Sequence, residues 1–134
     1  MKTPLTLKQN IVSWTAQLMA AVIMSQTLFF KFSGAEESVY IFETIGMEPW
    51  GRYATGVAEF IASVLLLIPK LSWIGAGLGV GLMSGAILMH LTLLGISVQD
   101  DHGYLFILAL TTLLSCILVL YIRRAQVYSL NRLV

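Results

Sequence analysis

Two ionisable residues, Glu59 and His90, lie inside long apolar stretches and are the candidate catalytic residues. A carboxylate at membrane depth costs about 3 kcal/mol on the insertion scale, so Glu59 must face a partner, a cavity or water. Glu59 follows Arg52 by seven residues and His90 precedes Ser97 by seven, which puts each about 10 Å deep at the rise of an α-helix. The matched depth predicts that both side chains line one polar pocket, in contact directly or through water.

Four further polar residues are expected to line this pocket. Thr55 and Ser63 lie four residues before and after Glu59, and therefore on the same face of a helix. Lys31 and Thr27 lie at the outer end of the preceding apolar stretch. Two interpretations stay open: a functional site, because ionisable residues within the membrane are functional by default, or a structural hydrogen-bonded pair that fixes helix register.

Motifs for a metal or a bound redox group are not found in the sequence. Cys116 is the one cysteine, which excludes an intrachain disulfide and a Cys-x-x-Cys pair. No pair of histidines or cysteines has the spacing of a metal site, and no haem-attachment or phosphate-binding glycine motif occurs. We therefore expect no metal site and no intrinsic cofactor.

The composition indicates a membrane protein. Of the 134 residues, 57% are hydrophobic and 11% are charged, and the mean hydropathy is +0.84. Soluble domains carry about 25% charged residues, so the composition argues against a soluble monomeric enzyme. The net charge of +1 gives no general attraction to nucleic acid, and the expected partner of the surface is the lipid bilayer.

Four stretches of the chain have about the length and apolarity that a spanning helix needs. Pro69 separates the second from the third, because proline ends a helix at the preceding residue. The first stretch is longer than the apolar core of a signal peptide, which predicts an uncleaved span. We expect an all-α integral membrane protein, an antiparallel bundle of four transmembrane helices in one domain, 1–134, with spans at about 11–30, 51–68, 71–96 and 104–122.

The charges of the connecting segments predict the orientation of the bundle. If the N-terminus lies inside, the outer side receives six of the seven acids and the inner side six of the eight basic residues. The positive-inside rule then places both termini in the cytoplasm. The basic residues on the inner side are Lys2, Lys8, Lys70, Arg123, Arg124 and Arg132.

A short amphipathic helix is expected at about 34–45, on the outer side between the first two spans. Ser33 and Glu36 fit a capping box at its start, and Gly46 fits the position just after its end. The favoured interpretation is a packed structural helix, and the alternative is a lid over the pocket. The expected apolar side holds Val39, Ile41, Phe42 and Ile45, and the polar side Glu36, Glu37, Glu43 and Thr44.

The third span carries glycines at Gly77, Gly81 and Gly85, four residues apart. This spacing forms two overlapping G-x-x-x-G motifs, which allow a neighbouring helix backbone to approach closely. The favoured interpretation is helix packing within the bundle, with Gly81 in close contact with another backbone. The alternative is the seam of a homodimer.

Four short motifs follow one another along nearly the whole chain: Leu28-Phe29-Phe30 with Ser33-Gly34, Gly56-Val57-Ala58-Glu59 with the run Val64-Leu65-Leu66-Leu67, Gly85-Ala86-Ile87-Leu88-Met89-His90, and Tyr128-Ser129-Leu130. Their order and spacing resemble the DoxX family of small four-span membrane proteins. The chain departs from the family pattern at two points: Glu37 stands where the family often has a lysine, and the Gly-Pro-Gly that commonly precedes the Tyr-Ser-Leu motif is absent.

The resemblance implies a role in redox chemistry of the bacterial inner membrane. Named members are subunits linked to quinone-coupled oxidation of sulfur compounds, or partners of thiol and oxidant-defence enzymes. Since this chain has no redox motif of its own, it would supply a quinone pocket, a proton site or an anchor to a redox partner protein. The lead expectation is a subunit or accessory of such a system; a small proton-coupled transporter and a non-catalytic membrane anchor or lipid-binding bundle are the alternatives.

Overall fold

The computed structural model describes residues 5–124, and this part of the chain is all-helical, without a strand. A π-helical segment, η1, continues α4 without a break in the chain. The bounds are Leu7–Ser33 for α1, Glu36–Thr44 for α2, Trp50–Leu66 for α3, Ser72–Met89 for α4, His90–Leu94 for η1 and Tyr104–Ile122 for α5.

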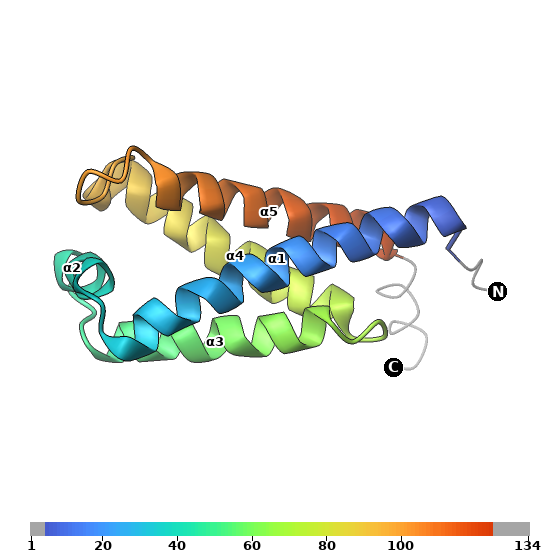
Figure 1. Cartoon of the computed structure of the whole chain (residues 1–134), viewed down its shortest axis with the longest axis horizontal. Coiled ribbons are helices and arrows are strands. Elements are labelled where there is room, and N and C mark those ends of the chain that lie inside the picture. Colours follow the sequence, from blue (N-terminus) through green and yellow to red (C-terminus); the bar gives the residue numbers. More distant parts are fainter. Residues whose placement is uncertain (1–4, 125–134) are drawn as a thin grey trace.

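Four long helices run side by side, and consecutive long helices point in opposite directions (Figure 1). α1 and α4 each pack against both α3 and α5, while the short helix α2 lies across one end. We call this end the α2 end, and the opposite end, where residues 67–71 connect α3 to α4, the Pro69 end. The core between the helices is built largely from small side chains, which let the helices approach closely; it includes Ala16, Ala20, Ala21, Ala62, Ala76 and Ala109.

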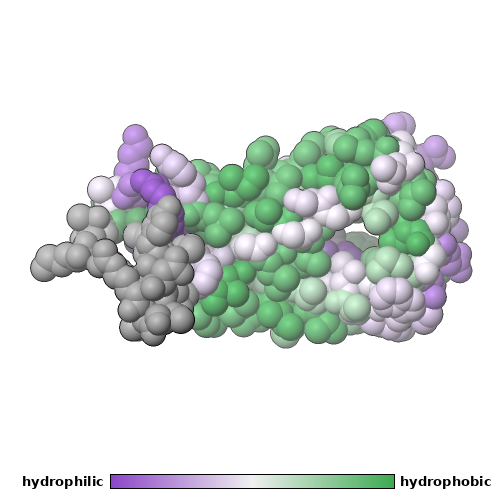
Figure 2. Space-filling model, turned by 180° about the vertical axis from the view of Figure 1, so that it is seen from behind, coloured by the Kyte–Doolittle hydropathy of each residue, from purple (hydrophilic) through white to green (hydrophobic). Residues whose placement is uncertain are grey.

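Three helical segments are long and apolar enough to cross a membrane: α1, the continuous segment Ser72–Leu94, and α5. α3 lies where the fourth span is expected, but it has 17 residues, fewer than the ~20 that a spanning helix usually needs. Figure 2 shows hydrophobic residues around the middle of the molecule and hydrophilic residues toward its ends. The all-helical prediction is confirmed, and three of the four predicted spans have the required length and composition.

The segments that connect the helices, which carry most of the charged residues, are divided between the two ends of the molecule. The connection 95–103 and helix α2 lie at the α2 end, whereas the start of α1, residues 67–71 and the end of α5 lie at the Pro69 end (Figure 1). The predicted break at Pro69 is confirmed, since α3 ends before it and α4 begins after it. Lys2, Arg132 and the motif Tyr128-Ser129-Leu130 lie outside the described residues.

The predicted start of α2 is wrong in its detail, although the helix itself is confirmed. Ser33 is the last residue of α1, and Gly34 ends that helix in the left-handed conformation with φ of 69°. Ala35 is therefore the N-cap of α2 and makes no side-chain capping bond. The capping box of this chain instead joins Thr6 and Gln9 at the start of α1.

The predicted end of α2 at Gly46 is confirmed. Gly46 has φ of 78°, a conformation that favours glycine. Its N–H donates to the carbonyl of Glu43 at 3.1 Å, and the N–H of Met47 donates to the carbonyl of Phe42 at 2.7 Å. This pair of bonds is a Schellman motif, and it turns the chain back toward α3.

The predicted packing role of Gly77, Gly81 and Gly85 within the chain is wrong. A Cβ built on any of the three meets no atom within 4 Å. The close contacts of α4 lie on its other face of small residues. A Cβ at Gly75 would lie 2.7 Å from the backbone nitrogen of Leu66, and a Cβ at Gly79 would lie 2.6 Å from Cys116 Sγ. Small residues occupy two faces of this helix, and spacing alone does not say which face meets a neighbour.

Candidate functional site

A cavity of about 460 Å³ lies at the α2 end, between the helices. Every helix from α1 to α5 contributes to its lining, and most of the lining side chains are apolar. This size is within the range of pockets that hold small organic molecules. Five of the six predicted pocket residues line it: Thr27, Lys31, Thr55, Glu59 and His90.

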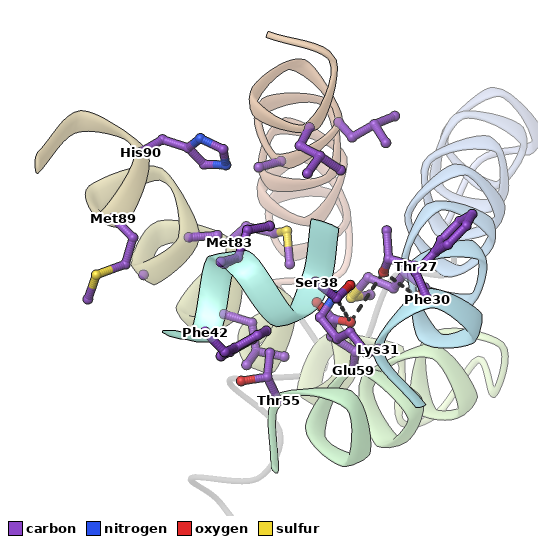
Figure 3. A pocket seen from close by; sticks show the side chains of 18 of the residues that line it. Thr27, Phe30, Lys31, Ser38, Phe42, Thr55, Glu59, Met83, Met89 and His90 are labelled. Atoms are coloured by element: carbon purple, nitrogen blue, oxygen red, sulfur yellow. Dashed lines mark hydrogen bonds and ion pairs between the residues drawn. The ribbon is translucent and has the colours of Figure 1, made fainter. Parts of the chain in front are cut away.

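A buried ion pair joins α1 to α3 at one wall of the cavity. Lys31 Nζ lies 3.0 Å from Glu59 Oε2, and only 14% and 4% of the two side chains are exposed. Thr27 Oγ1 lies 3.3 Å from the same carboxylate oxygen (Figure 3). The carboxylate that the sequence requires to find a partner is therefore satisfied by an ammonium group from the neighbouring helix.

Arg52 holds this end of α1 against α3. The Nε–H of its guanidinium is shared between the two carboxylate oxygens of Glu48, at 2.9 and 3.0 Å. A second nitrogen donates to the backbone carbonyl of Lys31. Since that carbonyl belongs to the residue whose ammonium faces Glu59, Arg52 fixes the position from which Lys31 reaches into the cavity.

His90 lies on another part of the cavity wall and does not contact Glu59. Its Nδ1 is 3.0 Å from the carbonyl of Gly95, and its ring packs edge-on against Phe106 at 5.6 Å. A carbonyl only accepts, so Nδ1 donates this bond, and in the neutral form of the imidazole Nε2 is then an acceptor. Figure 3 shows the ring apart from the Lys31–Glu59 cluster. The shared pocket is thus present, but the direct Glu59–His90 pair is not formed.

The π-helical segment begins at His90. π-helical turns are rare, and those within α-helices are frequent at functional sites; here the π-helical turn ends the segment that begins with α4. The next residue, Gly95, has φ of 79° and turns the chain, and its carbonyl accepts the bond from the imidazole. The change of helix type and the histidine bond are therefore parts of one local structure at the cavity.

Ser63 does not line the cavity, in contrast to the prediction. Its Oγ donates to the backbone carbonyl of Glu59 at 2.8 Å. A serine one turn along a helix readily bonds this carbonyl, which satisfies the hydroxyl without a pocket. Thr55, one turn before Glu59, does line the cavity.

α2 contributes to the cavity a carboxylate that the sequence analysis missed. Glu37 lines the cavity, together with Ser38, Ile41, Phe42 and Ile45. The predicted separation of Glu37, on the polar side, from Ile41, Phe42 and Ile45, on the apolar side, is therefore wrong at the cavity. The spacing of four residues between Glu37 and Ile41 could have indicated a shared face. α2 packs against α1 and α3, as the favoured interpretation predicts, and it also borders the cavity.

The surroundings of Glu37 disfavour its negative charge. Partial burial, and then the negative charge of Asp101, raise the pKa of Glu37 above its usual value. Asp101 belongs to the connection before α5, where its two carboxylate oxygens accept three backbone N–H bonds. On one wall of the cavity the charges of Lys31 and Glu59 thus balance each other, and on α2 the carboxyl group of Glu37 has a raised pKa.

A second buried polar cluster, also missed, lies at the Pro69 end. Arg123 Nε donates to Ser13 Oγ at 2.8 Å and to Gln17 Oε1 at 3.0 Å. Gln17 Nε2 in turn donates to the carbonyl of Leu66 at 2.6 Å. The spacing of four residues between Ser13 and Gln17, inside the first span, is the signal that could have found it. This cluster ties α1, α3 and α5 together away from the cavity.

Among residues 5–124, no group of three or more histidine, cysteine, aspartate or glutamate side chains is placed to hold a metal ion. Cys116 is buried beside Gly79, between α4 and α5, and does not line the cavity. The chemistry that the cavity offers therefore consists of hydrogen bonding, charge and proton exchange by Lys31, Glu59, Glu37 and His90.

Comparison with known proteins gives no match for this chain, whether among protein-family models, curated proteins or solved structures. The site is therefore interpreted from its own geometry.

Proposed function

We propose that this chain is a four-span, DoxX-like protein of the bacterial inner membrane that binds a quinone in its cavity and serves a redox partner as subunit or accessory. The observation that carries the proposal is the cavity itself: about 460 Å³ of mostly apolar space with the buried Lys31–Glu59 pair at one wall. Both termini would lie in the cytoplasm, with the acidic α2 end outside.

The surface of α3 supports a fourth span. Val57 and Phe60 are 50% and 55% exposed, and Ile61 and Val64 are exposed as well. An apolar stripe of this kind is stable where lipid rather than water covers it. At 1.5 Å per residue, α3 extends for about 25 Å, and modest thinning of the bilayer accommodates such a length.

The side chains of the cavity fit the chemistry of a quinone headgroup. Quinone carbonyls accept hydrogen bonds, which the Lys31 ammonium, with three N–H donors, can supply at the wall where Glu59 lies. His90 Nε2 makes no hydrogen bond within the described residues, and as an acceptor it suits the hydroxyl group of the reduced form. When bound, a quinone would supply two-electron redox chemistry, and the electrons would come from the partner protein.

The binding experiment uses the purified chain in lipid nanodiscs and measures the affinity for decylubiquinone. We expect Lys31→Met to weaken binding at least tenfold, because the variant removes the donor at the headgroup. The double variant Lys31→Met/Glu59→Leu removes the pair without leaving one buried charge unpaired, so it keeps the test valid if the single variant unfolds. Glu43→Gln is the matched control, since Glu43 is an exposed carboxylate of α2 that does not line the cavity.

Two results would contradict the proposal: a wild-type chain that binds no quinone, or a folded double variant that binds it as tightly as the wild type. A subunit role further predicts that a redox enzyme co-purifies with the chain in mild detergent. The quinone-dependent activity of that enzyme should be lost when the wild-type chain is replaced by the double variant.

Proton-coupled transport is the second candidate, favoured by the position of an ion pair inside a membrane cavity. Transport requires the pair to reach water on both sides, whereas the Arg123 cluster occupies the Pro69 end. Proton-coupled transport predicts that vesicles containing the chain take up protons, and that Glu59→Gln abolishes this uptake. A non-catalytic anchor or lipid-binding bundle predicts instead that Glu59→Gln leaves the phenotype unchanged.

A further inference from the structure

We infer that the ligand of this cavity reaches it sideways from the bilayer, through an opening over Gly81 and Gly85 between α4 and α3. The ligand class that follows is an amphiphile, with a polar headgroup at Lys31 and Glu59 and a long apolar chain that leaves through the opening. The inference rests on the proposed function in one respect, namely that the cavity binds a ligand.

The first observation is the position of the two glycines. Gly81 and Gly85 line the cavity and are at the same time exposed on the surface of the molecule. Exposed lining residues lie at the rim of a cavity; Gln26, Phe30 and Tyr104 satisfy both conditions as well, but only the two glycines lack a side chain there. A Cβ built on either one meets no atom within 4 Å, so the absent side chains leave a gap that no neighbouring residue fills.

The second observation is the divergence of α3 and α4. At the Pro69 end the two backbones touch, since a Cβ at Gly75 would lie 2.7 Å from the nitrogen of Leu66 and 2.8 Å from the oxygen of Ala62. Figure 1 shows the two helices separating from there toward the α2 end, and Figure 2 shows a hollow in the opposite face near that end. The opening therefore lies in the side of the molecule.

The third observation is the cover over the α2 end. Helix α2 lies across it (Figure 1), and its residues Ile41, Phe42 and Ile45 line the cavity, as Figure 3 shows for Phe42. These three apolar side chains restrict access from water at this end, where Glu37 and Ser38 of the same helix also line the cavity. The hollow in Figure 2, in contrast, borders the apolar middle of the exposed surface on one side and the more hydrophilic α2 end on the other. A membrane-dissolved molecule would reach it from the apolar side.

The polarity of the lining fits the orientation of an amphiphile. The Lys31–Glu59 pair joins α1 to α3, whereas Leu82, Met83 and Met89 accompany the two glycines on α4. A headgroup that accepts hydrogen bonds suits the first wall, and an unbranched or isoprenoid chain suits the second. A long-tailed quinone and a bilayer phospholipid share this chemistry, so the experiment must separate them.

The test uses Gly81→Leu and Gly85→Leu, which place a bulky side chain in the opening. Gly77→Leu is the matched control, because Gly77 is exposed on the same helix and a Cβ there also meets nothing within 4 Å, yet it does not line the cavity. All three variants are expected to fold, since leucine favours a helix over glycine. The probes are ubiquinone-10, tailless ubiquinone-0 and a spin-labelled phospholipid, each added to the chain in nanodiscs.

We expect each opening variant to weaken binding of ubiquinone-10 at least tenfold and to leave binding of ubiquinone-0 within twofold of the wild type. Gly77→Leu should change neither affinity. Equal affinities of the opening variants and the wild type for the tailed ligand would overturn the inference, as would an equal loss for both quinones. Immobilisation of the phospholipid probe without quinone binding would make a lipid the ligand, and would contradict the proposed function alone.

A second measurement tests the route without any ligand. A nitroxide label at Thr55→Cys, in a Cys116→Ala background, should be relaxed by lipid-soluble oxygen and not by a water-soluble nickel chelate. Gly81→Leu should lower the oxygen effect, and Gly77→Leu should not. A label that the nickel chelate reaches more readily than oxygen would show that the cavity opens to water, and would overturn the inference even if a quinone binds.

Discussion

The two ends of the helix bundle use the same kinds of residue for opposite purposes. At the Pro69 end, Gly75 brings α4 against the backbone of α3, and Arg123 joins Ser13 and Gln17 in a closed polar cluster. At the α2 end, Gly81 borders a cavity, and Lys31 and Glu59 form an ion pair in its wall. A glycine thus allows two helices to pack closely at one end and leaves room for a cavity at the other.

The difference follows from the angle between the helices. Where α3 and α4 converge, a missing side chain lets two backbones touch, and packing of this kind joins helices in lipid. Where they diverge, a missing side chain leaves a gap, and the polar groups nearby can face a ligand. We therefore expect substitutions at the Pro69 end to change stability, and comparable substitutions at the α2 end to change binding.

Gly75→Val is the substitution with the largest expected effect. Its Cβ would clash with the backbone of Leu66 and Ala62, at 2.7 and 2.8 Å, and backbone atoms cannot move aside as a flexible side chain can. Overpacking of this kind costs about 3 kcal/mol, so the midpoint of thermal unfolding should fall by about 10 °C. The measurement is thermal unfolding in detergent, followed by circular dichroism.

Gly77→Val is the control for this experiment, because a Cβ at Gly77 meets nothing within 4 Å. We expect the control to melt within a few degrees of the wild type. If the two variants melted alike, the close approach of α3 and α4 at Gly75 would be wrong, and with it the contrast between the two ends.

Arg123→Met has the second largest expected effect. The substitution keeps the length of the side chain and removes the donor that bonds Ser13 and Gln17 at 2.8 and 3.0 Å. Hydrogen bonds from a charged donor contribute about 2 kcal/mol, so the midpoint of unfolding should fall clearly. Quinone affinity of the folded fraction should stay unchanged, since the cluster does not line the cavity.

Arg124→Met is the matched control, because Arg124 is exposed and its guanidinium lies over the ring of Tyr121. Exposed substitutions of this kind change stability by about 0.5 kcal/mol or less. Equal effects of the two arginine variants would mean that the buried cluster does not stabilise the Pro69 end.

The sequence predicts the elements of this fold well because hydropathy and chain-breaking residues act locally. Pro69 and Gly46 stop helices through their own backbone preferences, and the structure has helix ends at both positions. The first, third and fourth predicted spans agree for the same reason, since each depends on the composition of a single segment.

Contacts between segments are harder to predict, and the misassigned residues show why. Glu59 needs a partner, but Lys31 and His90 both lie at a suitable depth, and the choice depends on how α1 and α4 are placed around α3. The two small faces of α4 have the same composition, so Gly75 and Gly81 cannot be told apart by spacing. Glu37 was misplaced because a short helix leaves the rotation of its faces undetermined.

Asp101→Asn has the smallest expected effect, and it distinguishes the two ends by pH. Asp101 accepts N–H bonds from Val98 at 3.0 Å, Gly103 at 2.8 Å and Leu105 at 3.1 Å, and so holds the connection that follows η1 at the α2 end. Burial alone would raise the pKa of Asp101, but the backbone bonds, with a smaller contribution from His90, lower it below its usual value.

A carboxylate whose pKa is lowered by folding stabilises the folded state above its unfolded pKa. This contribution is lost as the pH falls through the folded pKa, because the group is then protonated in both states. Asp101→Asn should therefore lower stability by about 1 kcal/mol at pH 7, as loss of a capping carboxylate does, and the difference should shrink below pH 4.

Asp100→Asn is the control, since Asp100 is exposed and its side chain bonds none of the described residues. Melting curves between pH 3 and pH 7 measure the effect, and a constant difference between wild type and Asp101→Asn across that range would contradict it. The loss caused by Arg123→Met should be the same at both pH values, because an arginine keeps its charge throughout; a pH-dependent α2 end and a pH-independent Pro69 end are then two separately measurable halves of one bundle.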